Sequence, residues 1–399
     1  MSQQSASSAP ASASSFKQSS SWVDTLLLYA AVVAAFVAMY TPQAVLPVIA
    51  RDLEVSPSAA SLSISVLIFG IALASLLMGP LSDRIGRKPV VVGCTLLLAL
   101  PSLLCALAPN LSTLLVWRFL QGCLVPGITA VTVTYLTEEF EASRSSALIG
   151  GYIGTTVFGG LMTRVLSGFV TELFGWRWAF GLGALFALLV GLLLLRLRPS
   201  THFHATPHIK QAFRGLWSHL SSRPIVGGLV VGFCLFFSFL AIFTYLPFYL
   251  EAPPFNFSPS ATGLIYLVYA TGMLSSPLSS LLTKRLSRRV VMALGMAVAL
   301  AANLATLTPS TVLLIAALLV LCFGNFATQS TATSFVATQA DHDRGGANSL
   351  YLFTYYLGGS LGAFLPGLLW TNFGWTGVLT LTCTMLVLGI TAALTLCRE

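Results

Sequence analysis

The chain has 399 residues, of which 56% are apolar and only 8% carry a charged side chain. A soluble globular protein carries roughly 25% charged residues, so this composition excludes a soluble domain. An apolar stretch of about 20 residues crosses a bilayer as a helix, because its backbone N–H and C=O groups are then satisfied internally. The sequence therefore predicts an all-α polytopic membrane protein.

The chain begins with a Ser/Ala-rich segment that carries a single charge in its first twenty residues and has no apolar period. We expect residues 1–23 to be a disordered tail. The first apolar stretch is too long for a removable signal peptide, and the tail lacks the arginines of a transit peptide.

Twelve apolar stretches follow the tail in two sets of six. Those of the first set are 26–49, 59–80, 89–108, 111–136, 146–170 and 176–195. Those of the second set are 225–250, 260–283, 290–308, 311–336, 347–370 and 376–396. The sequence thus predicts one six-helix bundle over residues 24–195 and another over 225–399.

The connection 196–224 is the one long internal loop, and we expect it to be a cytosolic linker. Apolar residues recur at helical spacing between Ile209 and Leu220, which predicts an amphipathic helix on the membrane surface. Four of the five histidines lie here: His202, His204, His208 and His219. Without cysteines or clustered acids beside them, we expect no metal site.

Basic residues are distributed unequally between the two sides of the membrane. Sixteen of the twenty lie in segments on the same side as the N-terminus, whereas only Arg51 and Arg177 lie on the opposite side. The positive-inside rule then places both termini in the cytosol, with the plasma (bacterial inner) membrane as the expected location. The net charge of +8 reflects this topology and does not predict a nucleic-acid partner. The expected partners are the lipid bilayer and a small-molecule substrate, and we expect a monomer.

The seven cysteines lie in or at the ends of apolar stretches without a close CxxC pair. We interpret them as small buried hydrophobic residues and expect neither a disulfide framework nor a zinc site.

The two halves repeat each other at an offset of 199 to 202 residues. Leu46-Pro47 matches Leu246-Pro247, Arg144 matches Arg344, and Phe174-Gly175-Trp176 matches Phe373-Gly374-Trp375. An offset kept over more than 100 residues indicates a duplicated six-helix unit. Parallel duplication of this kind places a substrate path at the interface of the halves, which rock about a central site.

Between the second and third stretches the chain reads Gly79-Pro80-Leu81-Ser82-Asp83-Arg84-Ile85-Gly86-Arg87-Lys88-Pro89. This segment resembles the GxLxDRxGRK signature of the major facilitator superfamily. Glycines allow close helix approach and a tight turn, and a carboxylate can accept from a helix N-terminus or an arginine. We expect a gate formed by Gly79, Asp83, Arg84, Gly86 and Arg87. The alternative is that the basic residues only anchor the topology.

In the fourth stretch, Arg118-Phe119-Leu120-Gln121-Gly122 resembles the RxxQG motif of the same superfamily and implies its twelve-helix drug:proton antiporter branch. A buried arginine needs a partner or an aqueous cavity. The second half has no arginine in its equivalent stretch, which favours a functional role for Arg118 over a structural one satisfied by carbonyl groups. The glycine-rich fifth stretch resembles the antiporter motif of that branch but lacks its Gly-Pro pair.

Arg164 is a second arginine within a predicted span, at a depth similar to that of Arg118. No carboxylate lies at mid-membrane, and Asp24, at the inner end of the first stretch, is the nearest candidate for proton titration. Unpaired positive charge would attract an anionic or strongly polar substrate or exclude a cationic one. The residues predicted to act in transport or coupling are Arg118, Arg164, Asp24 and Gln121.

Polar and aromatic side chains on the spans that face the central path suit broad selectivity for amphipathic solutes. Each is either a ligand or a packing residue, and the set is Tyr40, Gln43, Thr244, Tyr245, Tyr266, Tyr269, Asn325, Gln329 and Tyr355.

No nucleophile–base pair, HExxH, GxSxG or Walker sequence is present, so we expect neither an enzyme nor an ATP-driven pump. The antiporter resemblance implies proton-coupled efflux of drugs or metabolites, with the proton gradient as energy source and no cofactor. The alternative is a facilitator or uptake carrier for a polar or anionic metabolite. A receptor or scaffold is a further possibility, against which the intact signature residues argue.

Overall fold

A computed structural model describes residues 22–140, 142–200, 219–340 and 344–398. The predicted disordered tail, most of the predicted linker helix and three of its four histidines lie outside these ranges. Every regular element within them is helical, which confirms the predicted all-α fold. The predicted bundle boundaries stay predictions, although α7 ends at Leu194 and α9 begins at Arg223.

The first half contains seven α-helices and one short 3-10 helix. They are α1 Trp22–Tyr40, η1 Gln43–Val45, α2 Leu46–Asp52, α3 Pro57–Ile85, α4 Arg87–Ala106, α5 Leu111–Glu139, α6 Ala142–Phe174 and α7 Trp176–Leu194. Local chemistry sets their starts. Ser56 caps α3 by accepting from the Ala59 N–H at 3.2 Å, and Asn110 caps α5 through the Thr113 N–H at 3.0 Å.

The second half begins after η2 His219–Ser221. Its elements are α9 Arg223–Glu251, α10 Pro259–Ile265, η3 Tyr266–Thr271, α11 Gly272–Leu282, α12 Arg288–Ala305, α13 Thr311–Gln339, α14 Arg344–Phe364 and α15 Pro366–Thr395. Ser258 caps α10 by accepting from the Ala261 N–H, as Ser56 does for α3.

Eleven helical segments of the described chain are long and apolar enough to cross a membrane. The predicted span 347–370 falls on α14 and the start of α15, and α14 is not one of these eleven segments, so the twelfth crossing stays a prediction. The run α15 bends at Gly374, whose φ of 52° and ψ of −135° are not helical. Gly175, the equivalent residue of the first half, turns the chain between α6 and α7 with a φ of 93°. The φ angles of both glycines lie in the region that favours glycine.

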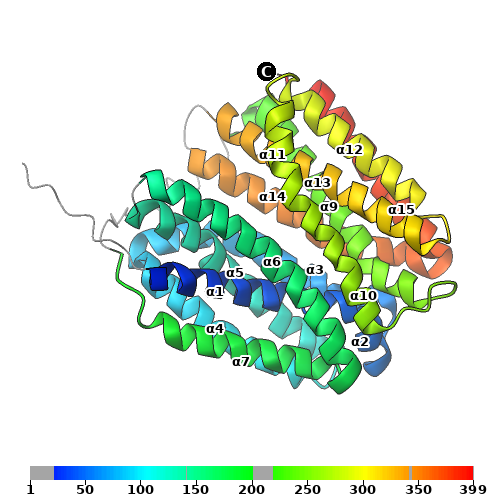
Figure 1. Ribbon diagram of the computed structural model, residues 1–399, viewed down its shortest axis with the longest axis horizontal. Coiled ribbons are helices and arrows are strands. Elements are labelled where there is room, and N and C mark those ends of the chain that lie inside the picture. Colours follow the sequence, from blue (N-terminus) through cyan, green and yellow to red (C-terminus); the bar gives the residue numbers. More distant parts are fainter. Residues whose placement is uncertain (1–21, 141, 201–218, 341–343, 399) are drawn as a thin grey trace, which may run out of the picture.

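The two bundles, α1–α7 and α9–α15, lie side by side (Figure 1). We call the end where α1 begins and α7 and α15 finish the terminal face, and the opposite end, at Asp52 and Glu251, the distal face. On the distal face, Arg51 forms an ion pair with Glu251, and the Ser260 N–H donates to Glu172 Oε2 at 3.0 Å.

Deeper in the molecule, two serines join the bundles. The Ser65 and Ser360 hydroxyl groups lie 3.0 Å apart, and each also donates to the other's carbonyl oxygen. Every hydrogen bond or ion pair between the halves that the structure describes lies at this depth or nearer the distal face. The described contacts therefore close the distal face.

The Arg51–Glu251 pair generates the first prediction. Both side chains are largely exposed, so the pair contributes about 1 kcal/mol or less to distal closure. Glu251→Arg replaces this attraction with repulsion and is expected to shift the population toward distal opening by up to about fivefold. Double electron–electron resonance measures this with spin labels at Leu107 and Leu307, which are exposed. Distal opening is expected to lengthen the distance between the two labels. The double swap, Arg51→Glu with Glu251→Arg, is expected to restore the wild-type distance, and a single variant with an unaltered distance contradicts the assignment.

Candidate functional site

The helix α1 breaks at Pro42, and this break shapes the centre of the first half. A helical carbonyl accepts from the N–H four residues on, but Pro42 has no N–H to donate to Ala38. The chain continues as η1, in which the Val45 N–H donates to the Pro42 carbonyl at 3.0 Å. The last carbonyls of α1 thus lie free inside the bundle.

Arg118 on α5 supplies the missing donors. Its Nη1 donates to the Ala38 carbonyl, and its Nη2 donates to that of Met39 at 2.9 Å. Its Nε donates to the Ser63 carbonyl on α3 at 2.8 Å. The side chain is completely buried, at the negative end of the α1 dipole, where a cation is favoured.

Gln121 belongs to the same network. Its Oε1 accepts from Arg118 Nη1 at 2.7 Å, and its Nε2 donates to Ser102 Oγ on α4 at 2.8 Å. Arg118 and Gln121 therefore hold four helices of the first half together, and their predicted roles in transport stay predictions.

The second half explains why it needs no equivalent arginine. At the repeat offset of 200, Pro42 corresponds to Ile242 and Arg118 to Leu318. Because Ile242 donates normally, α9 runs unbroken from Arg223 to Glu251. The sequence argument that Arg118 is not required by the scaffold is therefore wrong: the scaffold of the first half has a break that the second half lacks.

Arg164 on α6 lies on the other side of the same break. Its Nε donates to Gln43 Oε1 at 2.6 Å, and its Nη1 donates to the Gly160 carbonyl at 2.5 Å. Its side chain is 1% exposed. None of the ion pairs described for the chain includes Arg164, so its charge has only neutral partners.

Three tyrosine rings surround the Arg164 guanidinium. Its Cζ lies 3.7 Å from the ring centre of Tyr40, 4.5 Å from that of Tyr269 and 5.2 Å from that of Tyr266. Tyr266 and Tyr269 belong to η3, and residues three apart in a 3-10 helix eclipse each other. The local 3-10 geometry therefore presents both rings of the second half to one arginine of the first.

Two residues that contact Arg164 each carry a buried polar atom without a hydrogen-bond partner: Gln43 its Nε2 and Tyr269 its hydroxyl. Thr244 and Asn325 also carry buried polar atoms without a partner. Tyr355 stacks on Phe236 at 4.1 Å between ring centres, and Gln329 is partly buried.

Tyr245 has a different place from the one predicted. Its hydroxyl donates to Ser61 Oγ at 2.8 Å, so it joins α9 to α3 instead of lining the site around Arg164.

Further aromatic residues complete the site but were not predicted. Phe239 and Phe243 on α9 pack against Tyr269 with ring centres 5.1 and 4.6 Å away, and Phe326 on α13 packs against Phe239 at 5.6 Å. The spacing of Phe236, Phe239 and Phe243 along α9 places them on one helix face, and this was the signal available in the sequence.

Asp24 lies at the terminal end of α1, far along the helix from Tyr40. Its carboxylate is 3.6 Å from Arg198 Nε, and the residue is 3% exposed. The structure does not bring Asp24 together with Arg164.

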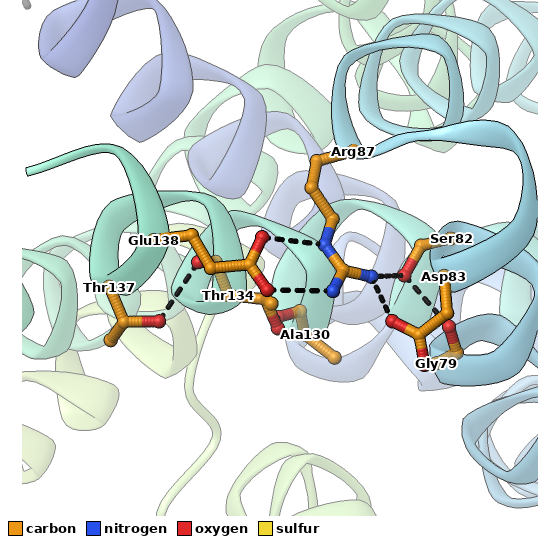
Figure 2. A network of polar contacts seen from close by, with 8 residues as sticks. All are labelled: Gly79, Ser82, Asp83, Arg87, Ala130, Thr134, Thr137 and Glu138. Atoms are coloured by element: carbon orange, nitrogen blue, oxygen red, sulfur yellow. Dashed lines mark hydrogen bonds and ion pairs between the residues drawn. The ribbon is translucent and has the colours of Figure 1, made fainter. Parts of the chain in front are cut away.

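The predicted gating segment forms a charge network at the terminal face (Figure 2). Arg87 donates from Nε and Nη2 to the two oxygens of Glu138 at 3.0 and 2.8 Å, and from Nη1 to Asp83 and to Ser82 Oγ. Glu138 on α5 was not predicted as a member. Its position near the terminal end of the fourth span was the only indication in the sequence.

The glycines of this segment differ in their roles. Gly86 has a φ of 99° and turns the chain between α3 and α4, as expected. Gly79 is exposed, and an added Cβ would meet no atom within 4 Å. The expectation that Gly79 permits close helix approach is therefore wrong for this conformation. Arg84 is exposed, which suits an interfacial anchor.

The second half keeps the arginine of this network without its acids. Arg288, at an offset of 201 from Arg87, donates to Thr338 Oγ1 at 2.6 Å, and Thr338 stands 200 residues from Glu138. At this position the second half thus has a neutral hydroxyl where the first half has a carboxylate.

Comparison with known families identifies the family to which this fold belongs. The family model described as Major Facilitator Superfamily matches residues 27–274 and 250–399. The chain belongs to this superfamily. It is accordingly a membrane transporter and not an enzyme.

Two relatives are informative. The chain is 36% identical over 368 residues to the inner membrane transport protein YnfM of Escherichia coli, covering 92% of this chain and 88% of that protein. It is 30% identical over 238 residues to the niacin transporter NiaP of Acinetobacter baylyi, covering 51% of this chain and 54% of that protein.

Among solved structures, a bacterial homologue of the human lysosomal transporter Spinster, in an inward-facing and unoccupied conformation, matches with a TM-score of 0.75. The match covers 93% of this chain and 95% of that one at 17% identity, which shows a shared fold.

The two buried arginines are expected to respond differently to substitution. Arg118→Leu leaves the Ala38 and Met39 carbonyls unpaired, at about 1–3 kcal/mol for each buried group. Arg164→Leu removes a charge that has no acid partner and is expected to leave stability unchanged or higher. Thermal unfolding of the purified protein in detergent measures both, and equal losses of stability would contradict this division of roles.

The terminal network gives a further prediction. Glu138→Gln removes one of the two carboxylates that neutralise buried Arg87 and is expected to cost about 1–3 kcal/mol. Thr338→Val, at the equivalent position of the second half, removes only a neutral hydrogen bond and is the matched control. The unfolding temperature of Glu138→Gln is expected to lie below that of Thr338→Val. The reverse order would show that the network does not stabilise this conformation.

Proposed function

We propose that the chain is a secondary carrier for a small solute that is negatively charged or strongly polar, moved by alternating access of the two halves. The observation that carries this proposal is Arg164, a buried cation at the interface of the halves whose described partners are all neutral. Alternating access in parallel-duplicated carriers operates about such a central interface site.

The energetics of Arg164 support a substrate with negative charge. Placing an arginine at the centre of a membrane helix costs about 2.5–3.5 kcal/mol on insertion scales. Each ring adds about 0.5–2 kcal/mol of cation–π attraction, so Tyr40, Tyr266 and Tyr269 offset much of that cost. Neutral groups stabilise the cation but do not cancel its field, so the attraction for an anion remains.

The name of one relative agrees with this proposal. The Acinetobacter baylyi protein is named as a niacin transporter, and niacin carries one carboxylate. That likeness spans about half of this chain, so it supports the class of solute and does not identify one.

Proton-coupled efflux of drugs or metabolites is the second candidate. It is favoured by the Arg118–Gln121 motif and by the glycines of α6. Gly159 packs closely against α1, since a Cβ added to it would lie 3.3 Å from Val33 Cα. Three acids of the first half near the terminal face, Asp24, Asp83 and Glu138, have arginine partners. Coupling through them would require those ion pairs to open.

Further parts of the proposal concern the setting. We propose the proton gradient as the energy source, a monomer as the working unit, and a bacterial inner membrane with both termini in the cytosol. The basic residues on the terminal face support this orientation, in which the described contacts would close the external side.

Flux into proteoliposomes under an imposed pH gradient tests the function. The panel contains a labelled organic anion, a neutral sugar and a cationic drug. The anion is expected to move, and Arg164→Gln is expected to lower its initial rate at least tenfold, because the attracting charge is gone. Arg177→Gln, at an exposed site on the distal face, is the control. Transport of the cation without the anion would favour the drug antiporter, and dependence on the pH gradient decides proton coupling.

A further inference from the structure

The donors beside Arg164 are arranged in a defined way. Gln43 uses its carboxamide oxygen to accept from Arg164 Nε at 2.6 Å. This bond fixes the orientation of the amide, so Gln43 Nε2 is left as a donor with no partner. A guanidinium has five N–H groups, and the hydrogen bonds of Arg164 with Gln43, Gly160 and the Tyr40 hydroxyl leave others for a ligand.

Tyr269, from the other half, carries a second unsatisfied group on a ring that packs against the Arg164 guanidinium. Its hydroxyl is buried without a partner, while its ring centre lies 4.5 Å from Arg164 Cζ. Its neighbour in η3, Tyr266, differs because its hydroxyl donates to the Phe243 carbonyl at 2.7 Å. Each unsatisfied buried polar group costs about 1–3 kcal/mol, so a ligand that pairs with both Gln43 and Tyr269 recovers that cost.

The combination of groups selects the chemistry of the ligand. Two N–H donor groups of fixed orientation and one hydroxyl call for an acceptor, and the positive charge calls for an anion. A carboxylate is planar, accepts at two oxygens, and matches the fork of a guanidinium. Arg118, the other buried arginine, uses its Nε, Nη1 and Nη2 on three carbonyls and Gln121, so Arg164 is the arginine with N–H groups left for a ligand. One guanidinium pairs with one carboxylate.

The surroundings of this donor set select the rest of the molecule. Phe239, Phe243 and Phe326 pack around the ring of Tyr269, and Tyr355 stacks on Phe236 one turn of α9 further toward the terminal face. Aromatic rings stack in offset or edge-to-face geometry, which contributes about 0.5–1.5 kcal/mol for each pair beyond the area buried. A planar aromatic body fits such a wall better than a polyhydroxylated one.

We propose that Arg164, Gln43 Nε2 and the Tyr269 hydroxyl bind the carboxylate of an aromatic monocarboxylate, whose ring lies against the phenylalanines of α9 and α13. This inference rests on the proposed function and narrows its solute to one chemical class. Because Tyr269 comes from the second half and the other two groups from the first, the carboxylate is held between the halves.

Calorimetric titration of the full chain in detergent with sodium benzoate tests the site, with benzamide as the uncharged ligand of the same shape. Benzoate is expected to bind at least tenfold more tightly than benzamide. Tyr269→Phe keeps the ring and removes one hydrogen bond to a charged group, so benzoate is expected to bind about 10- to 100-fold more weakly. Tyr249→Phe, whose hydroxyl donates to the Thr306 carbonyl outside the site, is the matched control.

Gln43→Glu is the sharper variant. It keeps the shape and the bond to Arg164, but it replaces the donor by a carboxylate oxygen and pairs the free charge within the protein. Benzoate binding is expected to be lost, whereas thermal stability is expected to stay or rise, which separates this result from misfolding. Retained benzoate affinity in this variant, equal affinity for benzamide, or absence of benzoate binding to the wild type each overturns the proposal.

The binding and flux experiments distinguish failure of the proposed site from failure of the proposed function. Movement of other solutes in proteoliposomes without benzoate binding leaves the carrier function standing and removes this site. Benzoate binding without flux of any solute keeps the site and removes the carrier function.

Discussion

The carbonyl of Ala38 lacks its helical donor because the residue four positions on is Pro42, and the centre of the first half is organised around that vacancy. Arg118 fills it from α5. Without this cation, two carbonyls would lie unpaired in a region that water does not reach, which a membrane protein does not tolerate. The bond to Arg118 holds the end of α1 in place, and the break then turns Tyr40 and Gln43 toward Arg164. Two arginines thus flank one short segment: Arg118 is held by four hydrogen bonds within the first half, whereas Arg164 also faces rings of the second half.

Duplication gave both halves the same helices, and single residues made them different. Ile242 in place of a proline lets α9 continue without a break at that point, and Thr338 in place of an acid accepts from Arg288 with a neutral hydroxyl. Arg51 and Glu251 show the converse case. They stand 200 residues apart at equivalent positions, so the pseudo-symmetry brings them together on the distal face, where opposite charges attract. Equivalent positions with identical charges would have repelled each other there.

The fold was predictable from the sequence because membrane crossing imposes a strong constraint on composition and length. The apolar spans and the repeat followed from hydropathy and spacing, whereas the terminal-face segment was recognised by its resemblance to a family signature. The eighth span is an exception, because its sequence does not predict the 3-10 helix η3 that begins at Tyr266. Arg118 was recognised as a buried arginine, but its partners are backbone carbonyls, which carry no signature in a sequence. Glu138 and Gln43 were equally hard to assign, because their partners lie 51 and 121 residues away and only the packing of helices joins them.

The partners of Arg164 are divided between the halves, and this division links binding to movement. Gln43, Gly160 and Tyr40 belong to the first half and stay with the arginine in any rigid rocking of the bundles. Tyr266 and Tyr269 belong to the second half, beside the contact of α6 with α10, where an added Cβ on Gly168 would lie 2.5 Å from the Pro259 carbonyl. Parting the distal face separates these rings from the cation and removes a few kcal/mol of cation–π attraction. A ligand shifts such an equilibrium only by the difference in its affinity for the two states. The proposed carboxylate loses the Tyr269 hydroxyl when the halves part, so its binding would favour the state in which the distal face is closed.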